Sequence, residues 1–233
     1  MTVYFRHPVA SEDKPQRYEI RKPVLLRQVG GSGFYRSAGK TLLDYLFVLA
    51  SLPVVAPLIG ILALLVAMDG ATPFYRQRRV GRNGKIFHIV KLRTMVPGAE
   101  HILQECLEKD PAARREWDHK QKLCNDPRIT RLGRLLRKTS IDELPQLWNV
   151  LRGEMSLIGP RPMMVEQQAL YPGTAYYHLL PGITGLWQVS DRNASSFAER
   201  STFDNNYYNG LSLKTDLSIL VRTIGVVLRG TGY

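Results

Sequence analysis

The stretch from Tyr45 to Met68 contains no charged side chain. About 20 apolar residues are enough for a helix to cross the hydrocarbon core of a bilayer, so this stretch is long enough to do so. Pro53 and Pro57 lie near its middle, and each removes a backbone donor and clashes with the preceding turn. A sharp bend is therefore expected in the middle of the stretch.

The charges on either side of this stretch bear on its topology. Residues 1–40 hold eight Lys or Arg against three Asp or Glu, and residues 69–93 hold seven against one. Cytoplasmic flanks of membrane segments collect Lys and Arg, and here both flanks do so. This pattern favours a re-entrant segment, built as helix, break and helix, that enters one leaflet and returns. A single spanning helix is the alternative.

The overall charge restricts the class of partner. The chain has 233 residues, a formal net charge of +12 and a pI near 9.9, which predicts an anionic partner such as nucleic acid, anionic lipid or a phosphorylated substrate. The basic residues cluster beside the apolar stretch, which favours anionic membrane lipids over nucleic acid. Cys106 and Cys124 have no metal-ligand spacing and are interpreted as incidental.

The chemistry is expected in the stretch from Arg137 to Pro162. Asp142 and Glu143 are adjacent acids with Arg134, Arg137 and Lys138 just upstream, and an acid pair between cations suits a metal ion and phosphates. The same residues also read as a capping box, with Ser140 as N-cap and Glu143 three positions later. Pro145 fits better if Asp142 is the N-cap. Spacing alone leaves both interpretations open, and either one predicts a helix start at the acid pair.

The sequence from Asp142 to Pro162 resembles the signature of the bacterial sugar transferases, the monotopic polyprenyl-phosphate phosphoglycosyl transferases. Further matching positions extend the resemblance over about residues 38–228, in the short form of the family. The overall sequence pattern is similar to that of ExoY-type galactosyl- or glucosyl-1-phosphate transferases of exopolysaccharide synthesis.

The resemblance implies specific roles for residues of this chain. Asp142 is implied as the nucleophile and Glu143 as the ligand of a Mg²⁺ ion. A second set is implied or expected to contact phosphate or substrate: Arg137, Arg161, Lys91 and Arg192. For Lys91 and Arg93 a solvated strand face is the alternative, with Lys91 the better phosphate candidate. The resemblance also implies a membrane helix kinked at Pro57, where Ala56 replaces the Ser of some members.

The remaining patterns predict an α+β fold that is mostly helical. Asn83-Gly84 between two strand-like runs predicts a small β-hairpin within residues 73–93, and Met155 to Ile158 reads as a short strand. Amphipathic helices are predicted from Ala99 to Lys122, after Pro162 to about Leu170, and from about Leu213 to Leu228; the last either packs on the core or lies in the membrane interface. The block 181–193 is interpreted either as a structural loop or as a ligand loop.

The chain is thus divided into a basic tail (1–37), a re-entrant membrane segment (38–69) and a compact catalytic domain at the cytoplasmic face (70–233).

The function that the resemblance implies is transfer of a sugar-1-phosphate, with galactose or glucose as the expected sugar, from a UDP-sugar to undecaprenyl phosphate at the bacterial inner membrane. A covalent aspartyl intermediate would form and UMP would leave. The rival from another class is a non-catalytic, membrane-anchored protein that binds anionic lipid or nucleic acid. An inactive scaffold is disfavoured because the motif is intact. The oligomeric state is left open, with a homodimer as one alternative.

Overall fold

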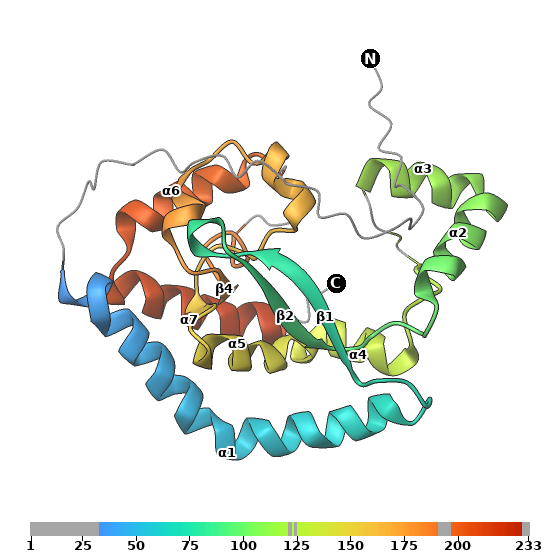
Figure 1. Cartoon of the computed structure of the whole chain (residues 1–233), viewed down its shortest axis with the longest axis horizontal. Helices are drawn as coiled ribbons and strands as arrows, with labels where there is room; N and C mark the ends of the chain where they lie inside the picture. The colour runs from blue at the N-terminus through green and yellow to red at the C-terminus, as the bar shows by residue number, and fades with distance from the viewer. Residues whose placement is uncertain (1–32, 121–122, 124, 191–196, 230–233) are drawn as a thin grey trace.

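The computed structural model describes residues 33–120, 123, 125–190 and 197–229. Helices and short helical turns surround two small sheets (Figure 1). In chain order the elements are a π-helical turn (Tyr35–Gly39), α1 (Lys40–Ala67), β1 (Phe74–Val80), a 3-10 turn (Arg82–Gly84), β2 (Ile86–Leu92), α2 (Ala99–Lys109), α3 (Pro111–Lys120), α4 (Arg131–Thr139), η3 (Ile141–Gln146), α5 (Leu147–Leu151), β3 (Ser156–Ile158), 3-10 turns at Val165–Leu170 and Ala175–His178, β4 (Gly182–Thr184), α6 (Arg200–Gly210) and α7 (Leu213–Leu228).

The apolar stretch forms one continuous helix, α1, which bends along its length (Figure 1). The predicted bend is therefore confirmed, and the predicted break between two helices is wrong, because α1 continues through both prolines (Figure 1). Pro53 and Pro57 remove only the N–H groups that would reach the Leu49 and Pro53 carbonyls, and the rest of the helical ladder persists. The segment Tyr35–Ala67 is long and apolar enough to cross a membrane by length and composition, and 6% of its most apolar window is buried against the protein.

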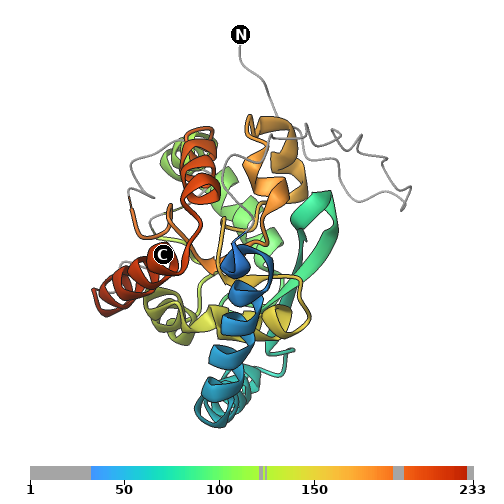
Figure 2. The same ribbon diagram turned by 90° about the vertical axis from the view of Figure 1, so that its left-hand side faces the viewer.

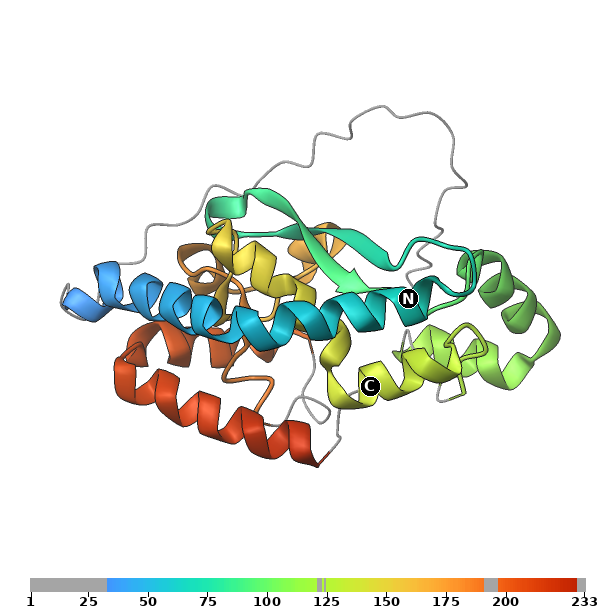
Figure 3. The same cartoon turned by 90° about the horizontal axis from the view of Figure 1, so that it is seen from below.

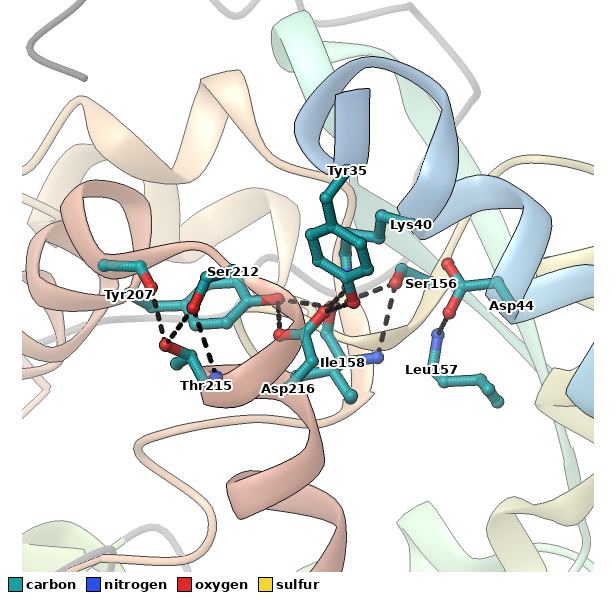
Figure 4. A network of polar contacts seen from close by, with 11 residues as sticks. Tyr35, Lys40, Asp44, Ser156, Leu157, Ile158, Tyr207, Ser212, Thr215 and Asp216 are labelled. Atoms are coloured by element: carbon teal, nitrogen blue, oxygen red, sulfur yellow. Dashed lines mark hydrogen bonds and ion pairs between the residues drawn. The ribbon is translucent and has the colours of Figure 1, made fainter. Parts of the chain in front are cut away.

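Both ends of α1 are fixed to the rest of the molecule. Near its start, Lys40 Nζ lies 2.8 Å from Asp216 Oδ2 on α7, and the hydroxyls of Tyr35 and Tyr207 donate to the same carboxylate (Figure 4). At the far end, Arg93 at the end of the hairpin pairs with Asp69 at 2.6 Å and also donates to the backbone carbonyl of α1 at residue 66. The helix therefore lies along the domain and is held at two points.

The predicted hairpin is confirmed. β1 and β2 pair antiparallel from Phe74↔Leu92 to Val80↔Ile86. The connecting turn places Asn83 at φ 59° and Gly84 at φ 74°, the left-handed region that Asn and Gly tolerate best.

The region from Ala99 to Lys122, predicted as one helix, contains two helices. Asp110 ends α2 with extended backbone angles, φ −123° and ψ 102°. Pro111 follows, and the residue before a proline is disfavoured in the helical region for steric reasons. The apolar face was predicted correctly, since Leu103 and Leu107 are buried.

Residues distant in sequence form the main hydrophobic core beneath the hairpin. Val48 of α1, Ile89 of β2, Val150 of α5, Ile158 of β3 and Ile219 of α7 belong to one buried cluster. β3, predicted as a strand, pairs in parallel with β4. Figure 2 shows α1 and α7 as separate rods on the same side of the molecule. The predicted bounds of α7 are confirmed, and the helix predicted after Pro162 is a 3-10 turn, Val165–Leu170.

Candidate active site

The acid pair lies in a tight junction between two helical segments. α4 ends at Ser140, which has φ 57° and is the first residue before η3. The Ser140 side chain makes no capping hydrogen bond at η3, so the capping-box interpretation is wrong. The left-handed conformation of Ser140 turns the chain sharply, and this turn brings Asp142 and Glu143 against β2. Both acids lie in the first turn of η3, so the predicted helix start at the acid pair is confirmed.

Two cations contact Glu143. Lys91 Nζ lies 2.5 Å from Glu143 Oε1, and Arg161 NH2 forms an ion pair with the same oxygen at 3.6 Å. Burial favours the neutral carboxyl, but these two cations outweigh it and lower the pKa of Glu143 to about 2. The carboxylate is therefore ionised throughout the physiological range. Lys91 of the hairpin and Glu143 and Arg161 of the stretch from Arg137 to Pro162, all predicted as site residues, do meet.

Asp142 has the opposite environment. It is 8% exposed, and burial together with the charge of Glu143 raises its pKa to about 6, although Lys91 and Arg137 oppose this. Two adjacent acids whose environments move their pKa values apart are typical of sites in which the acids have different roles. A partly desolvated carboxylate is also a better nucleophile than a hydrated one.

The turn that carries Arg161 is held by two arginines, half-buried Arg79 and buried Arg200, that the sequence prediction did not single out as site residues. Arg79 NH1 donates to the Pro162 carbonyl at 3.0 Å, and Arg200 NH2 donates to the Arg161 carbonyl at 2.7 Å. The Arg200 guanidinium also stacks over the rings of Trp187 and Phe197. Burial lowers the pKa of Arg79 to about 10, so it is still charged at neutral pH. These contacts hold the backbone of the turn at Arg161 and Pro162.

Arg137 and Arg93 differ in what they contact. Arg137 Nε donates to Thr94 Oγ1 at 2.8 Å and lies close enough to Asp142 to affect the pKa of that carboxyl. Arg93 instead binds Asp69 and carbonyls at the end of α1. Its contacts support a structural role, which leaves Lys91 as the better phosphate candidate. Arg192 falls outside the described residues, so its predicted contact stays a prediction.

The glycines of the loop 181–193 serve close packing. A Cβ on Gly182 would lie 2.1 Å from the Gly159 backbone nitrogen, and one on Gly185 would lie 2.0 Å from the Gly159 carbonyl oxygen. These contacts support the structural interpretation of the described part of the loop.

Five charged residues that the sequence predicted for the site surround one cavity of about 1160 Å³. Lys91, Arg137, Asp142, Glu143 and Arg161 line it together with apolar side chains of α1, β4 and α7. Sites for a single small molecule usually measure about 300–1,000 Å³. The volume and the mixed lining fit a site that holds a charged group and an apolar group together.

The acid pair suits a divalent cation in one particular mode. Among the described residues no three His, Cys, Asp or Glu side chains cluster as metal ligands. Mg²⁺, however, is commonly held by one or two carboxylates together with substrate phosphates. Glu143 is ionised, and its charge helps to raise the pKa of Asp142. A cation shared with a bound diphosphate would reduce that repulsion, so the donor set fits.

Similarity to known proteins agrees with this site. The model of the bacterial sugar transferase family matches residues 35–230. A UDP-galactose-lipid carrier transferase of Erwinia amylovora is 49% identical over 195 residues, 83% of this chain and 41% of that protein. Undecaprenyl-phosphate galactose phosphotransferase of Salmonella typhimurium is 48% identical over 181 residues, 77% of this chain and 38% of that protein.

A third relative matches over nearly its whole length. Exopolysaccharide production protein ExoY of Sinorhizobium fredii is 42% identical over 210 residues, which cover 89% of this chain and 90% of that protein. The chain spans about two fifths of the first two relatives. The family match covers most of the sequence, including every described residue of the site. The chain belongs to the bacterial sugar transferase family.

Proposed function

We propose that this protein transfers a sugar-1-phosphate, of galactose or glucose, from a UDP-sugar to undecaprenyl phosphate and thereby initiates exopolysaccharide synthesis. The observation that carries the proposal is the single cavity in which Asp142, Glu143 and three cations face apolar side chains of α1 and α7. Such a lining suits a reaction between a soluble diphosphate and a lipid phosphate. The names of the relatives, which include a galactose phosphotransferase and an exopolysaccharide production protein, support the same reaction.

In the first step, a carboxylate oxygen of Asp142 attacks the β-phosphorus of the UDP-sugar. The new bond joins that oxygen to phosphorus, and the bond from the β-phosphorus to the bridging oxygen breaks, so UMP leaves with the electron pair. In the second step, a phosphate oxygen of the lipid attacks the same phosphorus and the acyl-phosphate bond breaks. The products are undecaprenyl-diphosphate sugar and a regenerated Asp142 carboxylate.

The cations of the site reduce the repulsion between anions that this chemistry brings together. Arg161 and Lys91 lie at Glu143, and Arg137 lies near Asp142. Glu143 would hold Mg²⁺ together with the diphosphate oxygens, and the ion would neutralise charge that develops on them. Arg161 would then contact the phosphate next to Glu143, on a turn that Arg79 and Arg200 hold through the Pro162 and Arg161 carbonyls.

The proposal is tested by UMP release from a panel of UDP-sugars by the protein in lipid nanodiscs. With Mg²⁺ and undecaprenyl phosphate we expect turnover with UDP-galactose or UDP-glucose. Without the lipid we expect a stoichiometric burst, because the aspartyl intermediate cannot be resolved. If no sugar nucleotide yields UMP from folded protein, the non-catalytic lipid- or nucleic-acid-binding alternative gains support, and salt-dependent binding to nucleic acid would then favour it.

We also infer that α1 enters and leaves the membrane from the cytoplasmic face of the inner membrane. The helix has 28 residues and is about 42 Å long. Its two ends are held by Asp216 and Arg93, which belong to the same domain. A spanning helix would place these two contacts on opposite sides of the bilayer.

Thiol labelling tests this topology. In a variant without Cys106 and Cys124, cysteines introduced at Ser37 and at Thr72 are both expected to react with an impermeant reagent in inside-out vesicles and to be protected in right-side-out cells. A cysteine at Val54, which is 73% exposed in the middle of α1, is the control and should be protected by lipid in both. Labelling of the two ends from opposite sides would establish a spanning helix.

The raised pKa of Asp142 predicts a pH dependence. The nucleophile must be ionised, and its pKa is about 6, so the burst rate at limiting UDP-sugar should halve near pH 6 and fall about tenfold for each further unit of acid. A phosphate monoester such as the lipid also titrates near pH 6, so the burst should be measured without lipid. A burst rate that is constant down to pH 4.5 would contradict this environment for Asp142.

A further inference from the structure

One wall of the cavity is formed by two helices that are far apart in sequence. Phe47 and Val55 of α1 and Leu220, Ile224 and Val227 of α7 line the same cavity as the charged residues. We call these five residues the α1–α7 wall. Phe47 and Val55 are eight positions apart, about two helical turns, and Leu220, Ile224 and Val227 recur at spacings of four and three. Each helix therefore presents a mostly apolar stripe to the cavity, in which Ser51 of α1 and Thr223 of α7 are the polar members.

The α1–α7 wall opens to the outside. Phe47 is 49% exposed and Ile224 is 61% exposed, so the wall is not a sealed part of the core. Figure 3 shows α7 running alongside α1 in the view from below. The surrounding surface of α1 is also apolar, with Leu46, Leu49 and Val54 exposed. The exposed apolar surface of α1 therefore continues onto residues of the wall.

The opposite part of the cavity lining is charged and suits a phosphate. Lys91, Arg137 and Arg161 line it around the acid pair. An occupant that matches the entire lining must be an anion at one end and a hydrocarbon at the other. A UDP-sugar has no hydrocarbon portion, and the cavity is larger than a typical site for one small molecule.

We propose that the α1–α7 wall binds the isoprene units next to the phosphate of the polyprenyl acceptor, and that this phosphate is thereby directed toward Asp142. The inference rests on the proposed function and adds where the acceptor chain lies and which residues bind it. The chain enters between α1 and α7 from the lipid side, while the sugar nucleotide occupies the charged part of the cavity from the other side.

A matched pair of substitutions on α7 separates the wall from the general membrane-facing surface. Ile224→Trp places a large side chain at the wall. Val221→Trp places the same side chain on a residue that is 68% exposed and does not line the cavity. Both variants keep an apolar residue at the position, so their affinity for the membrane should be alike.

We expect Ile224→Trp to raise the KM for undecaprenyl phosphate at least tenfold and to leave the lipid-free UMP burst within twofold of the unmodified protein. Val221→Trp should change neither quantity by more than twofold. Equal effects of the two variants would overturn the proposal, because a shared effect reports on membrane contact. A smaller burst in Ile224→Trp alone would also overturn it and assign the wall to the sugar nucleotide.

A cross-linking experiment does not depend on turnover. With the photoreactive residue benzoylphenylalanine at position 224, we expect capture of radiolabelled undecaprenyl phosphate, removed by excess unlabelled undecaprenyl phosphate and not by phosphatidylglycerol. At position 221 we expect capture without this selectivity. Selective capture at 224 in a protein that releases no UMP would support the site and reject the proposed function. Turnover with equal competition by both lipids at 224 would reject the site and keep the function.

Discussion

Replacing Asp142 with asparagine is expected to lower UMP release at least about a thousandfold and, at the same time, to stabilise the folded protein at neutral pH. The loss of activity follows because an amide cannot form the phosphosugar intermediate, and removal of a nucleophile is among the most damaging changes in an enzyme. The gain in stability follows from the cost of burying an ionised carboxylate.

The sign and the pH range of this gain are fixed by the pKa of Asp142. Folding raises this pKa from 3.8 to about 6, so the charge of Asp142 destabilises the folded state above pH 6 and has no effect below pH 3.8. A difference of about two pKa units corresponds to about 3 kcal/mol as an upper value. Urea unfolding without divalent cations should show Asp142→Asn as the more stable protein at pH 7.5 and as equal at pH 4.

Glu143→Gln is the matched control, because folding shifts the pKa of this acid in the other direction. The pKa of Glu143 is lowered to about 2, so its charge stabilises the folded state at neutral pH, and the substitution removes the carboxylate partner of Lys91. We expect Glu143→Gln to be less stable at pH 7.5. Unchanged turnover in Asp142→Asn would keep the proposed activity and reject Asp142 as the nucleophile. A lower stability of Asp142→Asn at pH 7.5 would contradict the buried environment described for this carboxyl.

The substitution Asp216→Ala is expected to cost about 3–5 kcal/mol of stability, the usual effect of breaking a buried ion pair. Asp216 is 1% exposed and accepts from Lys40, Tyr35 and Tyr207 (Figure 4). Without the carboxylate, the Lys40 ammonium, 13% exposed, keeps its charge in a site that offers it much less water. Global unfolding measures the loss of stability. Hydrogen exchange of the first turns of α1 measures how far that end of the helix opens.

Asp69→Ala is the comparison at the other end of α1. The Asp69 side chain is 39% exposed, and exposed ion pairs contribute little to stability. Its effect on global unfolding should be much smaller, with faster exchange confined to the last turns of α1. Equal effects of the two substitutions would show that burial does not distinguish the two contacts.

Local patterns were enough to predict several elements. The hairpin follows from Asn83-Gly84 between two strand-like runs, and the bounds of α7 follow from its amphipathic pattern. The break before Pro111 had a local signal too, because a proline restricts the residue that precedes it. The single helix predicted from Ala99 to Lys122 rested on apolar periodicity, and this pattern does not register the break that Pro111 causes.

The contacts that build the site could not be read from periodicity. Arg79 reaches a carbonyl 83 positions away, and Arg200 reaches one 39 positions away. Ser140 reads as an ordinary N-cap in sequence, and only its position between α4 and η3 accounts for its left-handed conformation. Glu143 and Arg161 were predicted within one stretch and Lys91 within the hairpin, and only the tertiary structure places both cations at one carboxylate oxygen.

The two contacts that hold α1 also impose an order on its biosynthesis. α1 leaves the ribosome early, and its contact with Arg93 becomes possible after 24 further residues, whereas Lys40 must wait for Asp216, which follows it by 176 positions. The far end of α1 can therefore be held long before Lys40 can reach Asp216. During that interval Lys40 lacks the Asp216 carboxylate, so most of the chain must be synthesised before both ends of α1 are fixed.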